Sequence, residues 1–254
     1  MIRLKRTVYA IAAAVCAVVF VLSAYLIISR ISEGMKSGGQ FSSLQELKDS
    51  SESAASASGT ESRVPKYHLN IYEQNNDTIG WISIPDTKID YPVMQTEDPY
   101  DYYLKRSFTK EANDWGTPFV GLGCDAALPS DNIIIYGHHM KDGSMFSDLI
   151  KYESKSYYDT HSRIYFDTLY EKGQWEIVYA VKTVVYSDND PFKFWTYTSL
   201  EHDDDYNEFI EMAEKYKLYN TGVKVEKGDR FITLVTCEYS NKNGRMVIIA
   251  KKVK

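Results

Sequence analysis

Cysteine is scarce in this sequence, and the common metal-binding spacings are missing. Its 254 residues include three cysteines, Cys16, Cys124 and Cys237, and five histidines. Neither a Cys-x-x-Cys pair nor a His-Glu-x-x-His motif occurs, and adjacent histidines rarely both face one ion. The three aspartates at 203–205 are more simply explained as the first turn of a helix. We therefore expect neither a metal nor another cofactor.

Clusters of basic residues are also missing from most of the chain. The formal net charge is −6, with 29 Lys+Arg against 35 Asp+Glu. The first 30 positions hold four basic residues and no acidic one, so the remainder is more acidic than the whole. Binding to a phosphate backbone requires clustered lysine and arginine. The sequence therefore argues against nucleic acid as a partner.

One long segment carries no charge at all. Residues 8–28 are almost wholly apolar, and about 20 helical residues span a hydrocarbon core of roughly 30 Å. Arg3, Lys5 and Arg6 come before it, so the positive-inside rule predicts a cytoplasmic tail at 1–7 and an extracellular remainder. A cleaved signal peptide is the alternative, but its apolar region is usually about 7–15 residues with a small-residue cleavage site directly after it. We predict an uncleaved single-pass anchor in the cell membrane.

The segment after the predicted anchor differs from the rest of the chain. Residues 29–64 have few large apolar side chains and are rich in Ser, Gly, Ala and Glu. Such a segment cannot bury enough apolar surface to offset its ordering entropy, so it is predicted to be a flexible extracellular linker with a short helical turn near 42–47. Most of the 21 tyrosines lie beyond it. Residues 65–254 are sufficient for one domain with its own core.

Short runs of apolar and β-branched residues, separated by turn residues, recur along this domain. They are 82–84, 90–93, 117–120, 132–136, 163–166, 175–185, 230–236 and 245–251. Helical spacing is weaker and is seen at 69–76, 145–152 and, most clearly, 205–216. Many short strands at this spacing indicate a mainly β fold, closed or sandwiched, with a helical insertion before the strand near 231.

Two of these runs end in reactive side chains. Cys237 follows the run at 230–236, and His138 and His139 follow the run at 132–136 after one glycine. A thiol reacts as the thiolate and needs a base or cation nearby. The pattern therefore predicts a cysteine nucleophile with His138 as its base. An ordinary loop position for both histidines is the alternative.

An arginine begins the run that follows the cysteine. If residues 238–244 form a connecting loop, Arg245 lies opposite Cys237 at the facing ends of adjacent strands. Its planar, permanently charged head has five donors and suits the stabilisation of an oxyanion or the grip of a substrate carbonyl. The alternative is a surface arginine on a strand.

Taken together, these residues resemble the sortase family. The segment 233–237 matches its TLxTC signature, 136–138 matches its catalytic-histidine segment, and Arg245 stands where its arginine is expected. The longer strings at 136–146 and 80–84 resemble class B sortases in particular. The likeness extends over nearly all of the predicted domain.

The resemblance implies an eight-stranded β-barrel with N-terminal helices, and a cysteine transpeptidase of the Gram-positive cell surface. It implies that Cys237 attacks the Thr carbonyl of a sorting signal, NPxTN-like or LPxTG-like, and forms a thioester. His138 would protonate the leaving amine, and Arg245 would hold the substrate or stabilise the oxyanion, with the backbone amide of Glu238 as a second candidate donor. Thr236 and His139 are candidate supporting residues. The implied partners are secreted proteins that bear the signal and an amine of peptidoglycan or its lipid-linked precursor.

Three other interpretations compete with this one. A papain-type protease has its cysteine early and its histidine downstream, the reverse of the order here. An L,D-transpeptidase has its cysteine in a Ser-His-Gly-Cys context, which this chain lacks. A non-enzymatic β-barrel surface protein, with a structural Cys124–Cys237 disulfide and tyrosines as a binding face, is the remaining alternative.

Overall fold

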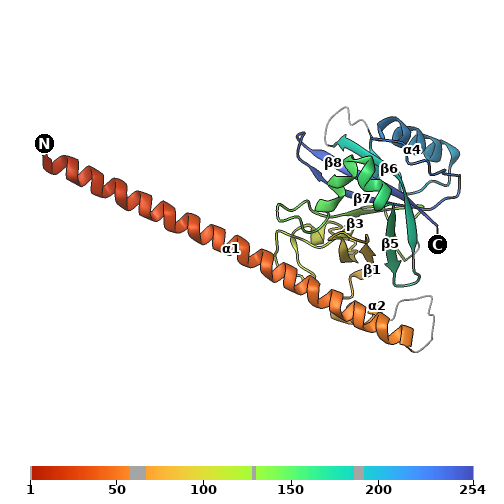
Figure 1. The fold of residues 1–254 in the computed structure, drawn as a ribbon, viewed down its shortest axis with the longest axis horizontal. Helices are drawn as coiled ribbons and strands as arrows, with labels where there is room; N and C mark the ends of the chain where they lie inside the picture. Colours follow the sequence, from red (N-terminus) through yellow and green to blue (C-terminus); the bar gives the residue numbers. More distant parts are fainter. Residues whose placement is uncertain (1, 58–66, 128–129, 186–191, 254) are drawn as a thin grey trace. The chain divides into compact units, whose positions relative to one another are not determined.

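The core of the protein is a closed β-barrel. The computed structural model describes residues 2–57, 67–127, 130–185 and 192–253. Within these residues the strands follow the closed order β1-β2-β3-β4-β7-β8-β6-β5 (Figure 1). Their bounds are β1 Thr78–Ser83, β2 Asp90–Met94, β3 Phe119–Val120, β4 Asn132–Tyr136, β5 Arg163–Thr168, β6 Gln174–Val184, β7 Phe231–Glu238 and β8 Gly244–Lys252. The eight-stranded barrel that the family resemblance implies is confirmed, and each strand predicted from the residue pattern corresponds to one of these.

The strand that carries the candidate nucleophile is the most deeply enclosed. Every residue of β7 is buried except Cys237, as expected for a strand covered on both faces. It pairs with β4 in parallel and with β8 in antiparallel orientation. Because β4 and β7 are parallel neighbours, the residues that follow them leave the barrel at the same edge. This topology decides where the site lies.

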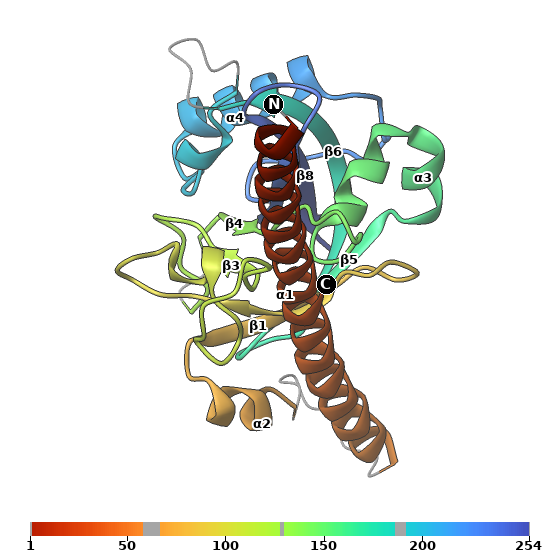
Figure 2. The same ribbon diagram turned by 90° about the vertical axis from the view of Figure 1, so that its left-hand side faces the viewer.

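Helices cover the barrel and connect its strands. They are α2 Tyr67–Gln74, α3 Lys155–Thr160 and α4 Asp203–Tyr216, with the 3-10 helices η1 Tyr102–Lys105, η2 Ser147–Glu153 and η3 Phe194–Thr196. Helix α4 contacts β6 (Figure 2), and its buried Phe209 meets Phe231 of β7 edge to face at 5.5 Å between ring centroids. The helices predicted at 69–76 and 205–216 are present, whereas the one at 145–152 is largely 3-10 rather than α.

The N-terminal part of the chain is a single helix, α1, from Ile2 to Ala57. It crosses the boundary between two compact units, Met1–Ser42 and Ser43–Lys254. The predicted linker at 29–64 is therefore helical as far as Ala57 instead of flexible, and residues 58–66 lie outside the described part. The physical reason is that Ala, Leu, Gln, Glu and Lys favour helix, serine costs only tenths of a kcal/mol, and no proline precedes Pro65.

Part of α1 has the properties of a membrane span. Its segment Tyr9–Ser51 contains a window long and apolar enough to cross a bilayer, by length and composition. The anchor predicted at 8–28 falls at the start of this segment. Its orientation and the exact domain bounds remain predictions.

Candidate active site

The register of β4 against β7 brings the predicted base and nucleophile together. The parallel pairing runs from Asn132 and Phe231 to Tyr136 and Val235. One step further, the amide of Gly137 donates a hydrogen bond to the Val235 carbonyl at 3.1 Å. The residues that follow the two paired strands, beginning with His138 after β4 and Thr236 at the end of β7, therefore lie side by side at one edge of the barrel.

The register of β7 against β8 adds the guanidinium. Cys237 and Arg245 are directly opposed across the antiparallel ladder, with the connecting loop closing at the pair Glu238 and Gly244. Directly opposed residues place their side chains on the same face of a sheet. The facing of Cys237 and Arg245 that the sequence predicted is thus present in the structure.

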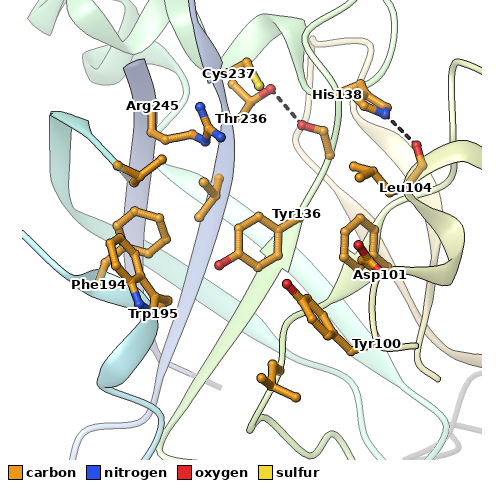
Figure 3. A pocket seen from close by; sticks show the side chains of 15 residues that line it. Tyr100, Asp101, Leu104, Tyr136, His138, Phe194, Trp195, Thr236, Cys237 and Arg245 are labelled. Carbon is orange, nitrogen blue, oxygen red and sulfur yellow. Dashed lines mark hydrogen bonds between the residues drawn. The ribbon is translucent and has the colours of Figure 1, made fainter. Parts of the chain in front are cut away.

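These side chains line one pocket of about 370 Å³. Cys237, His138 and Arg245 lie at the same end of it (Figure 3). The walls beyond them are largely aromatic and aliphatic, and include Tyr100, Leu104, Tyr136, Phe194 and Trp195. A pocket with apolar walls and a few convergent polar groups is the usual form of a ligand site. Four of these wall residues come from loops and 3-10 turns, where no sequence periodicity marked them.

A backbone carbonyl fixes the orientation of His138. Its Nε2 lies 2.6 Å from the carbonyl oxygen of Leu104 (Figure 3). A carbonyl only accepts, so Nε2 is the donor and carries a proton. The other ring nitrogen, Nδ1, is then the one whose proton can be exchanged with a reacting group. Leu104 was not among the sequence-predicted residues, because its contribution is made by the backbone.

A glycine makes room for this contact. Gly116 has a φ of +64°, and a Cβ built on it would lie 2.7 Å from the Leu104 carbonyl oxygen and 3.1 Å from Cδ2 of His138. A side chain here would be strained and would push apart the two groups that the hydrogen bond joins. Gly116 thus permits the close approach on which the His138 orientation depends.

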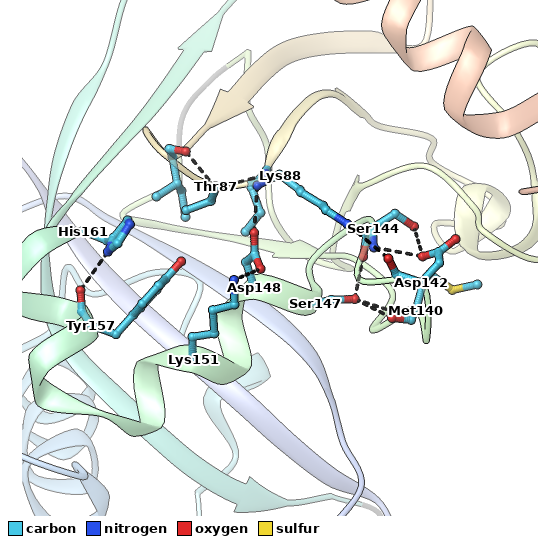
Figure 4. Close-up of polar contacts among 12 residues, drawn as sticks. Thr87, Lys88, Met140, Asp142, Ser144, Ser147, Asp148, Lys151, Tyr157 and His161 are labelled. Carbon is cyan, nitrogen blue, oxygen red and sulfur yellow. Dashed lines mark hydrogen bonds and ion pairs between the residues drawn. The ribbon is translucent and has the colours of Figure 1, made fainter. Parts of the chain in front are cut away.

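The loop after His138 is held by a polar network. Asp142 accepts hydrogen bonds from Trp115 Nε1 at 2.8 Å and from Ser144, and its carbonyl accepts one from Lys88 at 3.1 Å. Burial opposes the charge on Asp142, but the bonds from Ser144 and Trp115 outweigh it and hold the pKa of this carboxyl below its ordinary value. Asp148 accepts from the Lys88 amide at 2.7 Å (Figure 4). The turn between β1 and β2, which carries Lys88, is therefore tied to the histidine loop through Asp142 and to η2 through Asp148.

The predicted supporting residues lie at the same edge but do different things. Thr236 donates its hydroxyl to the carbonyl of Gly137 at 2.7 Å, and His139 Nδ1 lies 3.0 Å from the carbonyl oxygen of Cys237. The side chain of Glu238 is buried and accepts bonds from the amide and hydroxyl of Ser240, at 2.8 and 2.7 Å. It organises the loop between β7 and β8, so only its backbone amide remains a candidate oxyanion donor.

Cys124, the other cysteine of the domain, does not line the pocket. All three cysteines are free, so the structural Cys124–Cys237 disulfide of the alternative interpretation is wrong. Cys124 is buried, its sulfur accepts from the Ile134 amide at 3.4 Å, and burial raises the pKa of its thiol to about 11. In the described part of the chain, no group of three or more His, Cys, Asp or Glu side chains could hold a metal ion.

At one end of an apolar pocket, the barrel thus brings together a thiol, an oriented imidazole and a guanidinium. These are the features of a cysteine enzyme that transfers acyl groups. Comparison with known proteins places it more closely. The family model of the sortase domain matches residues 82–253, and the chain belongs to the sortase family. It is a cysteine transpeptidase by family.

The most informative relatives are class B members. The chain is 36% identical to sortase B of Staphylococcus aureus over 182 residues, which is 71% of this chain and 72% of that protein. It is 36% identical to sortase B of Listeria monocytogenes over 181 residues, 70% of this chain and 71% of the relative. The solved Staphylococcus aureus sortase B-substrate complex superposes with a TM-score of 0.76 at 30% identity, covering 88% of this chain and 99% of that one. The class B resemblance seen in the sequence is confirmed.

Proposed function

We propose that this chain is a membrane-anchored sortase that cleaves a C-terminal sorting signal after threonine and joins the threonine to an amine at the cell wall. The observation that carries the proposal is the pocket end at which Cys237, His138 and Arg245 meet. Each supplies a group that acyl transfer needs: a nucleophile, a proton carrier and a fixed positive charge.

In the first half-reaction, the sulfur of Cys237 attacks the threonine carbonyl carbon and its proton passes to Nδ1 of His138. The guanidinium of Arg245 stabilises the negative charge that develops on the carbonyl oxygen, and the backbone amide of Glu238 is the second donor. When the peptide C–N bond breaks, the proton on Nδ1 moves to the leaving amine. The product is a thioester between Cys237 and the threonine.

In the second half-reaction, an incoming amine attacks the thioester. Its proton returns through His138 Nδ1 to the sulfur as the C–S bond breaks, which restores the thiol and forms the new amide. The other ring proton stays on Nε2 throughout, because Nε2 donates to the Leu104 carbonyl in both the neutral and the charged ring. Without an amine, water takes its place and the enzyme hydrolyses its substrate.

The same proposal covers location and partners. The anchor at 8–28 would hold the barrel on the outer face of a Gram-positive membrane, with residues 1–7 in the cytoplasm. Exported proteins with an NPxTN-like or LPxTG-like signal, and the amine of peptidoglycan or of its lipid-linked precursor, would then meet at one surface. Confinement to that surface raises their effective concentration, so tight binding is unnecessary. The apolar walls of the pocket suit the aliphatic part of such a signal.

The direct test uses the full-length chain in detergent with quenched peptides that contain NPxTN and LPxTG cores. Mass spectrometry should find cleavage between Thr and the following residue in one of the two sets. Adding triglycine as an unhindered primary amine should convert the hydrolysed product into a threonyl-triglycine amide. Cleavage at another bond, or no triglycine adduct at any concentration, would contradict the proposal.

The proposed role of Arg245 predicts a large effect from a substitution that keeps its charge. Lysine cannot reproduce the planar fork of donors, and loss of one oxyanion donor costs about 10²–10³ in rate. We expect Arg245→Lys to lower kcat/KM for the peptide by about a hundredfold at an unchanged melting temperature. Arg163→Lys, at a surface ion pair with Glu176 on β5 and β6, is the matched control and should leave turnover unaltered. Near-normal activity of Arg245→Lys would rule out a geometric role.

A further inference from the structure

The contact between β4 and β7 extends beyond their backbone hydrogen bonds. Its last backbone bond is that of the Gly137 amide to the Val235 carbonyl. Beyond it, Thr236 Oγ1 donates to the Gly137 carbonyl at 2.7 Å, and His139 Nδ1 lies 3.0 Å from the carbonyl of Cys237. Side chains therefore continue the pairing as far as the residue that carries the nucleophile.

The contact between His139 and Cys237 has a defined direction. The Cys237 carbonyl only accepts, so the proton lies on Nδ1 of His139. His138, by contrast, carries its fixed proton on Nε2. The two adjacent histidines are therefore opposite tautomers. Because Nδ1 of His139 carries the proton, this nitrogen has no lone pair facing β7 with which to act as a base. This argues for a positioning contact and not for a second base.

Tyr239 makes the reciprocal contact. Its ring stacks on that of His139, with centroids 5.0 Å apart and an interplanar angle of 26°. Its hydroxyl donates to the His139 carbonyl at 3.1 Å. Two hydrogen bonds therefore join the segment after β4 to the end of β7, and they run in opposite directions. The His139 imidazole donates to the Cys237 carbonyl, and the Tyr239 hydroxyl donates to the His139 carbonyl.

Tyr239 is held in place although most of its surface is exposed. The turn that follows it is fixed by Glu238, which accepts from the Ser240 amide and hydroxyl. Lys182 of β6 reaches the same turn, lying 3.5 Å from Glu238 and 2.9 Å from Glu153. Burial raises the pKa of the Tyr239 hydroxyl, the proximity of Cys237 raises it further, and Arg245 lowers it. The phenol thus lies within the electrostatic reach of both reacting groups.

We infer that His139 and Tyr239 form a clasp that sets the separation and orientation of His138 relative to Cys237, which makes them positioning residues for the acyl transfer. The inference rests on the proposed function. Each arm of the clasp lies within two residues of a reacting group, so its loss changes the geometry of proton transfer directly. A displacement of about 1 Å at a reacting centre can cost about a hundredfold in rate.

Three substitutions separate the parts of the clasp. His139→Phe keeps the stacked ring and removes the donor, while His139→Asn places an amide N–H where Nδ1 stood. Tyr239→Phe keeps the stack and removes only the hydroxyl. We expect kcat to fall about thirtyfold in His139→Phe and about fivefold in Tyr239→Phe. KM should change little, and His139→Asn should recover most of the loss.

The experiment measures kcat and KM of the full-length chain in detergent with the peptide that the wild type cleaves, together with melting temperatures. Tyr170→Phe is the control, because Tyr170 is exposed and does not line the pocket. Wild-type kcat in all three variants, an effect on KM alone, or equal losses in His139→Asn and His139→Phe would overturn the clasp. Should His139→Phe fail to fold, Tyr239→Phe decides alone. If the wild-type chain cleaves no sorting peptide, the proposed function itself is overturned. If the wild type cleaves it and the variants keep the wild-type kcat, only the clasp is overturned.

Discussion

Replacing Cys237 with alanine is expected to abolish both peptide cleavage and transfer to an amine. Among the described residues that line the pocket, Cys237 supplies the only thiol, and it lies at the end where Arg245 and His138 meet. Removal of a covalent nucleophile leaves only binding and oxyanion stabilisation, so the loss should exceed about 10⁴-fold. The alanine variant should still bind the signal peptide, because the apolar walls are untouched. Turnover and peptide binding by fluorescence anisotropy check the two halves of this expectation.

The second cysteine of the domain provides the control. Cys124 is buried, and its thiol stays protonated at pH 8 because burial raises its pKa to about 11. In a Cys16→Ala background, iodoacetamide at pH 8 should therefore modify one thiol, that of Cys237, in step with the loss of activity. Cys124→Ala should retain near-normal turnover. Activity that survives in Cys237→Ala, or that is lost through alkylation of Cys124, would remove Cys237 from the mechanism.

The strand ends of this site were predictable because they are written in local pattern. The run at 132–136 ends just before Gly137 and His138, and the run at 230–236 ends just before Cys237, so each candidate catalytic residue could be assigned to a strand end. The short span between Cys237 and Arg245 fixed their facing by the geometry of a hairpin. The parallel pairing of β4 and β7 could not be read from either run, since it joins residues about a hundred positions apart. The family resemblance implied that Cys237 and His138 act together, but the pairing itself is known only from the structure.

What the sequence did not reveal depends on backbone atoms and on loops. The carbonyl of Leu104 orients His138, yet any residue at that position has a carbonyl, so no side-chain pattern marks it. Gly116, which makes room for that contact, has the identity of an ordinary turn glycine. Phe194 and Trp195 reach the pocket from a 3-10 turn with no periodicity. His139 was singled out only as a neighbour, because its bond to the Cys237 carbonyl requires the two strands to be in register.

In the second half of α1, composition predicted a flexible chain where the structure has a helix. Serine, glycine and glutamate at 29–57 indicated a flexible chain because they bury little surface. The structure continues the helix through this segment, and Lys48 and Trp81 both reach the same carboxylate oxygen of Asp90, at 2.5 and 2.6 Å. A few specific polar contacts and the absence of proline can keep such a segment helical without a large apolar face.

Substituting glutamine for His138 should cost about 10²–10⁴ in peptide cleavage, the contribution of a positioned acid or base. The Nε2 of glutamine can still donate to the Leu104 carbonyl, so the local structure should persist, but nothing replaces the proton that Nδ1 carries to the leaving amine. That proton matters only when the leaving group is a poor one. We therefore expect the deficit to shrink to about tenfold when the scissile amide is replaced by a p-nitrophenyl ester, whose leaving group departs without protonation.

The comparison of the two substrates separates acid catalysis from general damage to the site. His202→Gln, at an exposed histidine before α4, should match the wild type on both. If His138→Gln lost activity equally on amide and ester, His138 would have to act mainly in forming the thiolate or in shaping the pocket. A deficit much larger on the amide than on the ester would instead assign the proton on Nδ1 to the leaving amine. The two substrates share the other requirements: deprotonation and attack by Cys237, the oxyanion and the apolar walls.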